Sequence, residues 1–281
     1  MEQGINLAFV LKRRNQPDRP LAQALELCQN AGFTALDYLT DVQCPDYLER
    51  ARKARREIDR LGLRVEQSHC PFFRYQMDAE PGALFRKFAP RAAEAAAILG
   101  ARFLVIHADE YRVENTYDVP EILDFTHSCL TPTVELCSSL GVKPAFENVF
   151  EDGCGHQVTG CGRFCSRIQE LLDVIRMFPG SGCCWDFGHA QVASKERAMD
   201  EFAAIQPYLF CTHVHDNTHG ADLHKPAFFG DVPWESAMDI MKRGGYSGVF
   251  SWEFVYERFP DALMPGFLQF VHETGEYLDR L

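Results

Sequence analysis

Short apolar runs alternate with longer amphipathic stretches along the whole chain. Short apolar runs bounded by turn residues predict strands, and apolar residues that return at helical spacing predict helices. The strands are expected near Ile5–Val10, Ala35–Leu39, Arg64–His69, Phe103–His107, Lys143–Asn148, Cys183–Phe187, Phe210–His215 and Gly248–Phe254. The helices are expected near Leu21–Ala31, Asp46–Leu61, Pro81–Leu99, Ile122–Leu140, Cys165–Met177, Lys195–Ile205, Glu235–Arg243 and Leu263–Leu281.

This order is the pattern of eight repeated βα units. A glycine stands just before several expected strands, where a helix end often needs a left-handed residue. These glycines are Gly32, Gly62, Gly100, Gly141 and Gly245. No linker rich in Pro, Ser or Gly interrupts the order. We therefore expect one α/β domain over residues 1–281.

Six of the expected strands run into a residue that can bind a divalent metal or move a proton. The pairs are Ser68-His69, Ile106-His107, Phe146-Glu147, Trp185-Asp186, Val214-His215 and Trp252-Glu253. Side chains at the carboxyl ends of parallel strands converge on one rim when the strands close into a barrel. Two long polar segments, 149–162 and 216–233, also follow strands. The sequence thus predicts a single site at this rim.

The composition favours a small substrate. The formal net charge of -12 argues against a general binder of polyanions, because nucleic-acid affinity depends on Lys and Arg. The segment Met1–Gly4 does not resemble a signal peptide, and no apolar run approaches the roughly 20 residues that cross a bilayer. We expect a soluble, cytoplasmic protein that binds neither nucleic acid nor membrane.

The 11 cysteines are expected to remain thiols, since a chain of this length without a signal peptide is seldom held by disulfides. Cys154, Cys161 and Cys165 cluster in one stretch but form no CxxC pair. We interpret them as reduced residues of a loop and a helix start rather than as metal ligands.

Four rim residues predict a divalent metal site: Glu147, Asp186, His215 and Glu253. Taken singly, each is better explained as a salt-bridged or capping side chain, but four at equivalent strand ends favour a site. Carboxylates with an imidazole suit Mn²⁺, Zn²⁺, Co²⁺ or Mg²⁺. His213 projects to the same side as His215 but earlier in the strand, so His215 is expected to be the ligand and His213 a deeper support.

The motifs in these strands resemble those of the xylose-isomerase-like superfamily of sugar isomerases and epimerases, over essentially the whole chain. They are Glu147-Asn148, Trp185–His189, His213–Asn217, Gly230–Trp234 and Trp252-Glu253. The resemblance implies a single (β/α)₈ TIM barrel with one catalytic divalent metal at Glu147, Asp186, His215 and Glu253.

The resemblance also implies a mechanism. In such epimerases Glu147 and Glu253 would face opposite sides of one substrate carbon and exchange its proton through an enediolate. His107 and His189 would bind substrate oxygens, with His69 as a further candidate, and Lys225 would meet a phosphate if the substrate carries one. The expected partner is a small sugar or sugar phosphate. Isomerase, epimerase, inosose dehydratase and hydroxypyruvate isomerase remain open.

A rival function comes from the same superfamily. Endonuclease IV, which repairs abasic DNA, uses three zinc ions, and this chain has matches to its ligands at His69, His107, Glu147, Asp186, His189, His215, Asp222, His224 and Glu253. The expected acidic fourth loop, with Asp109, Glu110, Glu114 and Asp118, would repel DNA phosphates. A catalytically idle barrel that binds carbohydrate is disfavoured, because unpaired buried carboxylates are costly.

Two further features leave alternatives open. Arg74, Arg112 and Arg163 lie in expected rim loops and are more simply explained as solvated charges than as phosphate ligands. Aromatic residues at Phe72, Phe73, Tyr75, Phe228 and Phe229 suit either stacking on a sugar or a contact in a homo-oligomer.

Overall fold

The computed structural model describes residues 1–13, 16–71, 80, 82–108, 119–150, 163–218, 220–255 and 259–281. Eight parallel strands form one sheet in the order β10-β1-β2-β3-β4-β5-β6-β7. They are β1 Gln3–Asn6, β2 Ala35–Asp37, β3 Arg64–His69, β4 Phe103–Ile106, β5 Lys143–Glu147, β6 Gly182–Asp186, β7 Leu209–His213 and β10 Phe250–Trp252. The Val214 amide donates to the Ser251 carbonyl at 2.8 Å and closes the sheet between β7 and β10. The predicted (β/α)₈ barrel is confirmed.

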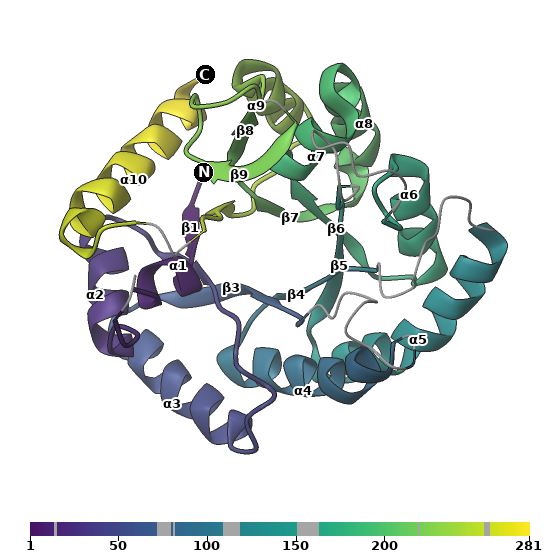
Figure 1. The fold of residues 1–281 in the computed structure, drawn as a ribbon, viewed down its shortest axis with the longest axis horizontal. Helices are drawn as coiled ribbons and strands as arrows, with labels where there is room; N and C mark the ends of the chain where they lie inside the picture. The colour runs from purple at the N-terminus through teal and green to yellow at the C-terminus, as the bar shows by residue number, and fades with distance from the viewer. Residues whose placement is uncertain are drawn as a thin grey trace.

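Helices surround this ring of strands (Figure 1). They are α1 Leu7–Leu11, α2 Leu21–Asn30, α3 Tyr47–Arg60, α4 Ala83–Leu99, α5 Val119–Leu140, α6 Ile168–Met177, α7 Phe187–Ser194, α8 Ala198–Ile205, α9 Trp234–Arg243 and α10 Met264–Arg280. Each presents apolar residues to the barrel, and the large core lies between the two layers. Among the described residues, no helix combines the length and apolar character needed to cross a membrane.

On β4 to β7, the inward side chains form an apolar layer with a layer of ionisable residues above it. Phe103, Val105, Ala145, Cys184 and Cys211 form a separate buried cluster inside the strands. Because side chains alternate with a period of two, the next inward positions along the same strands are residues 107, 147, 186 and 213. All four are ionisable and buried. These four strands thus place a layer of apolar side chains beneath a cluster of His, Asp and Glu side chains.

The first expected strand is wrong over residues 7–10. β1 ends at Asn6, and Leu7 begins the short helix α1. The Asn6 side chain donates to the Phe254 carbonyl and accepts from the Phe254 amide, both at 3.1 Å, which ties the end of β1 to the chain beyond β10. Leu7 and Phe9 are fully buried in the helix, so their apolar pattern did not distinguish helix from strand.

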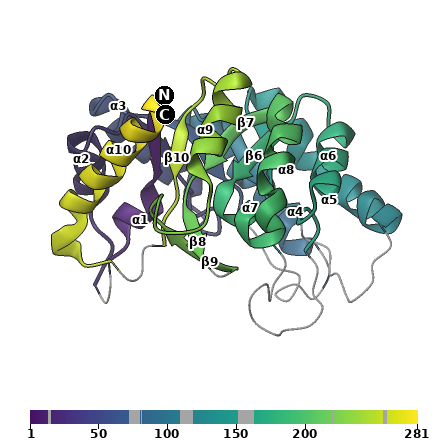
Figure 2. The same ribbon diagram turned by 90° about the horizontal axis from the view of Figure 1, so that it is seen from above.

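Two elements were not expected from the sequence. The segment after β6 forms the helix α7 at once, because the Asp186 side chain accepts the His189 amide at 2.6 Å and caps the helix. The segment expected as a long polar loop contains the antiparallel hairpin β8 Asp216–Thr218 and β9 Ala221–Lys225. Figure 2 shows this hairpin on the strand-exit side of the barrel, opposite the two termini.

Other bounds shift slightly, and α6 begins at Ile168 rather than at Cys165, which has a φ of 72°. The nine cysteines within the described ranges are all free thiols, and eight of them are buried. Cys154 and Cys161 lie outside those ranges.

Candidate metal centre

Glu147 lies at the centre of the layer of ionisable residues. Its side chain is 1% exposed. Oε2 lies 3.2 Å from His69 Nε2 and 3.0 Å from His107 Nε2. Oε1 lies 3.1 Å from His213 Nδ1 and 3.3 Å from His189 Nδ1. Four imidazoles from four different strand exits therefore converge on one carboxylate.

The first group of potential ligands contains Glu147, Asp186, His213 and Glu253, whose donor atoms lie within 4.8 Å of one another. His213 Nδ1 is 3.5 Å from Glu253 Oε2 and 3.9 Å from Asp186 Oδ2. Three carboxylates and one imidazole, of which only Glu253 is partly exposed, fit a divalent cation such as Mn²⁺, Zn²⁺, Co²⁺ or Mg²⁺. This group could hold a metal ion.

The predicted set is brought together only in part, because His213 and not His215 completes the group. In the barrel register His213 is the partner of Asp186, so its side chain reaches the level of the three carboxylates. His215 lies beyond the end of β7, with its Nε2 3.0 Å from Asp186 Oδ2. We expected His215 to be the ligand because it comes later in the strand. That expectation did not account for the pairing of His213 with Asp186.

His215 belongs instead to a second group with His189, Asp222 and His224. Its ring stacks on His224 with centroids 3.8 Å apart. The ring also fills the space where a side chain on residue 188 would lie: a Cβ on Gly188 would come within 2.0 Å of His215 Cε1. The glycine of the Trp185–His189 motif is therefore required for this packing.

The hairpin delivers Asp222 and His224 to the barrel mouth. Asn217 Oδ1 accepts the amides of Leu223 (2.5 Å) and His224 (3.1 Å), and Asn217 Nδ2 lies 3.3 Å from Asp222 Oδ1. His224 has a φ of 46°, a conformation that L residues adopt at a cost. The buried Asp216 fixes the base of the hairpin by accepting from Trp234 Nε1 at 3.0 Å. In the sequence, Asp216 and Asn217 stood only within the His213–Asn217 motif and were assigned no role.

A third group consists of His69, His107 and Glu147. The sequence placed the two histidines as substrate ligands, and the structure places both against the central carboxylate. Their rings meet edge to face with centroids 5.0 Å apart. Glu147 is shared between this group and the first, so it could bridge two cations.

The carboxylates hold protons on the histidines. Burial alone would lower the pKa of His189, but Asp186 and Glu147 outweigh it and raise this pKa to about 10. Burial also opposes the charge on His224, yet the hydrogen bond to Asp222 contributes to raising its pKa to about 9. A metal ion would therefore have to displace protons from these imidazoles.

The same contacts act in the opposite sense on Glu147. Burial disfavours its charge, but the nearby His213 and His107 hold the pKa of this carboxyl well below its usual range. Glu147 is thus favoured in its ionised form and is surrounded by imidazoles that can donate to it.

Lys225 directly follows His224 on β9. Its Nζ donates to Thr218 Oγ1 at 2.7 Å across the hairpin. Arg163 is buried, with its guanidinium 5.4 Å from the centroid of the Phe150 ring. Several residues named in the sequence analysis lie outside the described residues. They are Arg74, Arg112, the acidic residues of the fourth loop and the aromatic residues at 72, 73 and 75.

Phe228 and Phe229 are half-exposed and pack on α10. Phe228 meets Tyr277 edge to face with centroids 5.8 Å apart, and Phe229 meets Phe270 at 6.1 Å. They lie beyond the hairpin rather than in the groups that surround Glu147.

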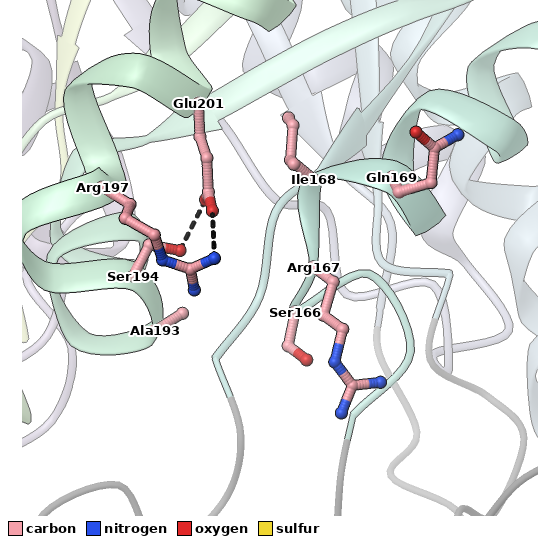
Figure 3. Close-up of a pocket in the computed structure, with 8 residues that line it drawn as sticks. All are labelled: Ser166, Arg167, Ile168, Gln169, Ala193, Ser194, Arg197 and Glu201. Atoms are coloured by element: carbon pink, nitrogen blue, oxygen red, sulfur yellow. Dashed lines mark hydrogen bonds and ion pairs between the residues drawn. The ribbon is translucent and has the colours of Figure 1, made fainter.

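A separate cavity of about 460 Å³ lies between the start of α6 and the α7–α8 segment (Figure 3). On one wall of the cavity, Glu201 faces Ser194 and Arg197. Arg167, the residue before α6, lies on the other wall. The residues that line this cavity belong to none of the ligand groups. The cavity is therefore distinct from the candidate metal centre.

Comparison with known proteins places these features in context. Residues 25–271 match the model of the family described as xylose isomerase-like TIM barrel. An uncharacterized protein of Methanocaldococcus jannaschii is 27% identical over 167 residues, which are 58% of this chain and 54% of that protein. The match thus spans about half the length of this relative.

Two solved structures illustrate the likeness of fold. A D-psicose 3-epimerase with D-tagatose from Clostridium cellulolyticum H10 superposes with a TM-score of 0.76 at 14% identity, covering 99% of both chains. An IolI protein with a binding zinc atom superposes with a TM-score of 0.70 at 15% identity, covering 99% of this chain and 96% of that one. At these identities the likeness shows the fold.

The raised pKa values of His189 and His224 predict how the metal-free protein responds to pH. A group whose pKa is raised by folding adds stability that is fully present below its unfolded pKa, about 6.5, and is lost as pH rises through the folded value. We expect the Tm of chelator-treated protein to fall between about pH 6.5 and 10. Scanning calorimetry across this range measures it.

The control is His127→Gln, at an exposed position of α5 outside the ligand groups. This variant should show the same fall in Tm as the wild type, whereas His224→Gln should show a smaller one. A Tm that stays level or rises in the metal-free wild type over this range would contradict the protonated state of the cluster.

Proposed function

Because the chain belongs to the family of xylose isomerase-like TIM barrels, we propose that it is a divalent-metal-dependent isomerase or epimerase acting on a sugar, a sugar phosphate or a related polyhydroxy ketone. The observation that carries the proposal is the group of Glu147, Asp186, His213 and Glu253 at the barrel mouth, in which the first three are buried and Glu253 is partly exposed. Among the structures of similar fold, a D-psicose 3-epimerase with D-tagatose supports the substrate class.

The four residues would hold the metal, with His213 in the place that the sequence assigned to His215. When bound, the cation would polarise the substrate carbonyl and so make the proton on the adjacent carbon easier to remove. The set is rich in oxygen donors, which suits Mn²⁺, Co²⁺, Mg²⁺ or Zn²⁺. The protein contributes the negative charge of the carboxylates, the position of the donor atoms and the layer of apolar side chains beneath them.

The two glutamates have different environments, which suggests different roles. Glu147 is fully buried, and each of its oxygens faces two imidazoles, so it has little capacity to accept a proton from substrate. The side chain of Glu253 is 22% exposed and faces His213 and His224 at 3.5 and 3.9 Å. We propose that Glu253 removes or returns the substrate proton and that Glu147 acts first as a ligand.

The histidines would orient the substrate and return its proton. His189 carries a proton at neutral pH and lies between the first and second groups, where it can donate to a substrate oxygen. His107 and His69 remain candidates for the same task on the other side of Glu147. Return of the proton to the same carbon from the opposite face gives epimerisation, and return to the neighbouring carbon gives isomerisation.

A second candidate function is cleavage of DNA at abasic sites. The observation in its favour is that ligand-type groups flank the first group on both sides, His69 with His107 on one side and Asp222 with His224 on the other. A site for several zinc ions is suited to phosphodiester hydrolysis. The net charge of -12 opposes the binding of DNA, and on that ground we place this function second.

The division of roles between the two glutamates predicts different effects when each is replaced by glutamine. Glu253→Gln should retain bound metal but lower the exchange of substrate protons by about 10²- to 10⁴-fold, because an amide cannot accept the proton. Glu147→Gln should lose metal and exchange together. Incorporation of solvent deuterium next to a ketose carbonyl, followed by NMR, measures exchange, and elemental analysis measures metal.

The control for both variants is Glu201→Gln, on the separate cavity of Figure 3, which should leave exchange and metal content unchanged. Full exchange in Glu253→Gln would remove this residue from the proton-transfer role.

The substrate class is tested by a panel of tetruloses, pentuloses, hexuloses and their phosphates with Mn²⁺, Co²⁺, Mg²⁺ or Zn²⁺, beside an abasic oligonucleotide. We expect metal-dependent conversion of at least one ketose and an intact oligonucleotide, because the acidic chain repels phosphodiester backbones. Cleavage of the oligonucleotide without conversion of any sugar would overturn the proposal in favour of the nuclease.

A further inference from the structure

Both ring nitrogens of His213 face carboxylates, but the carboxylate on the Nε2 side belongs to none of the ligand groups. Nδ1 lies 3.1 Å from Glu147 Oε1, as described above. On the opposite edge of the ring, Nε2 lies 3.0 Å from Asp37 Oδ2. Among the described residues, Asp37 is in none of the potential metal groups. His213 is therefore held between the candidate metal centre and a carboxylate that lies behind it.

Asp37 is the last residue of β2, and its side chain is almost fully buried inside the barrel. Its Oδ2 is 3.3 Å from Gln67 Nε2, and the same nitrogen is 3.3 Å from the Thr212 carbonyl. Gln67 is on β3 and Thr212 is on β7, the strand that carries His213. Since β10 and β1 separate β7 from β2 in the barrel, these contacts cross its interior and fix Asp37 relative to His213.

We propose that Asp37 is a positioning residue for the metal centre, which accepts a hydrogen bond from His213 Nε2–H and thereby keeps Nδ1 directed at Glu147, Asp186 and Glu253. A neutral imidazole carries its proton on one nitrogen only, and a cation can be bound only by the other. With the proton on Nε2, the lone pair of Nδ1 faces the three carboxylates. The inference rests on the metal site proposed above and extends it to a residue outside the ligand set.

Two consequences follow from this arrangement. A carboxylate behind a metal-bound imidazole fixes the tautomer and ring orientation and makes the ligand more basic, and removal of such a partner weakens metal binding by about 10- to 100-fold. A purely structural acid at this position would affect the stability of the metal-free fold but leave metal affinity unchanged. Metal affinity therefore separates the two roles.

The test compares Asp37→Ala and Asp37→Asn with the full-length wild type. Metal-free proteins are titrated with Zn²⁺ against a chromophoric chelator, which gives the affinity of each site without any sugar. We expect the tightest site to weaken by about 10- to 100-fold in Asp37→Ala. Asp37→Asn should weaken it less, because an amide oxygen can still accept from Nε2–H but carries no charge. With Co²⁺ in place of Zn²⁺, the visible spectrum of the tightest site should change in both variants.

Glu66→Gln is the matched control. Glu66 is also a buried acid, 1% exposed, but it pairs with Arg102 at 2.9 Å and with Arg64 at the start of β3. This variant should lower the Tm of the metal-free protein and leave Zn²⁺ affinity at the wild-type value. If Asp37→Ala fails to fold, the Asn variant, which keeps the size of the side chain, carries the test.

Zn²⁺ affinities within about twofold of wild type in the folded Asp37 variants would overturn the positioning role. That result differs from a failure of the proposed function, in which the wild type itself would bind no metal or convert no sugar. Because the measurement uses the metal alone, the two outcomes are distinguishable.

Discussion

One buried anion determines the arrangement of the barrel mouth. Glu147 is 1% exposed, and a charge in that position is tolerated only when it is paired and hydrogen-bonded. Four imidazoles from the exits of β3, β4 and β7 and from the start of α7 supply those contacts. Three of these imidazoles also meet a further carbonyl or carboxylate, so the cluster extends outward from Glu147: His69 the Cys70 carbonyl, His189 the Asn148 carbonyl and His213 the Asp37 carboxylate. A metal ion bound at this residue would have to displace protons from the surrounding imidazoles.

The barrel places this charged cluster directly above a layer of apolar side chains. Side chains that alternate along β4, β5, β6 and β7 give an apolar cluster first and ionisable residues one step later. The low polarity beneath the cluster strengthens each contact within it. The hairpin β8–β9 supplies Asp222 and His224 at the mouth, on the side that Figure 2 shows opposite the termini. The apolar layer, the ring of strands and the hairpin together leave the strand-exit side of the barrel as the place for chemistry.

The sequence predicts the barrel and most of the cluster for a simple reason. Strand ends are marked by a change from apolar to ionisable residues, and Glu147, Asp186 and Glu253 follow that rule. The sequence cannot, however, resolve a shift in register between neighbouring strands. His213 and His215 share one face of the expected strand Phe210–His215, and only the pairing of His213 with Asp186 places His213 among the carboxylates. Asp37 was missed because the expected strand ran on to Leu39, which moved the strand end past the acid.

The central claim is that a divalent cation is bound by Glu147, Asp186, His213 and Glu253. The most direct measurement is an anomalous difference map from crystals of zinc-loaded protein, recorded at the zinc absorption edge. We expect the strongest peak about 2.0–2.2 Å from His213 Nδ1 and from an oxygen of each carboxylate. A peak bonded to His215 and not to His213, or a barrel mouth without any peak, would contradict the account.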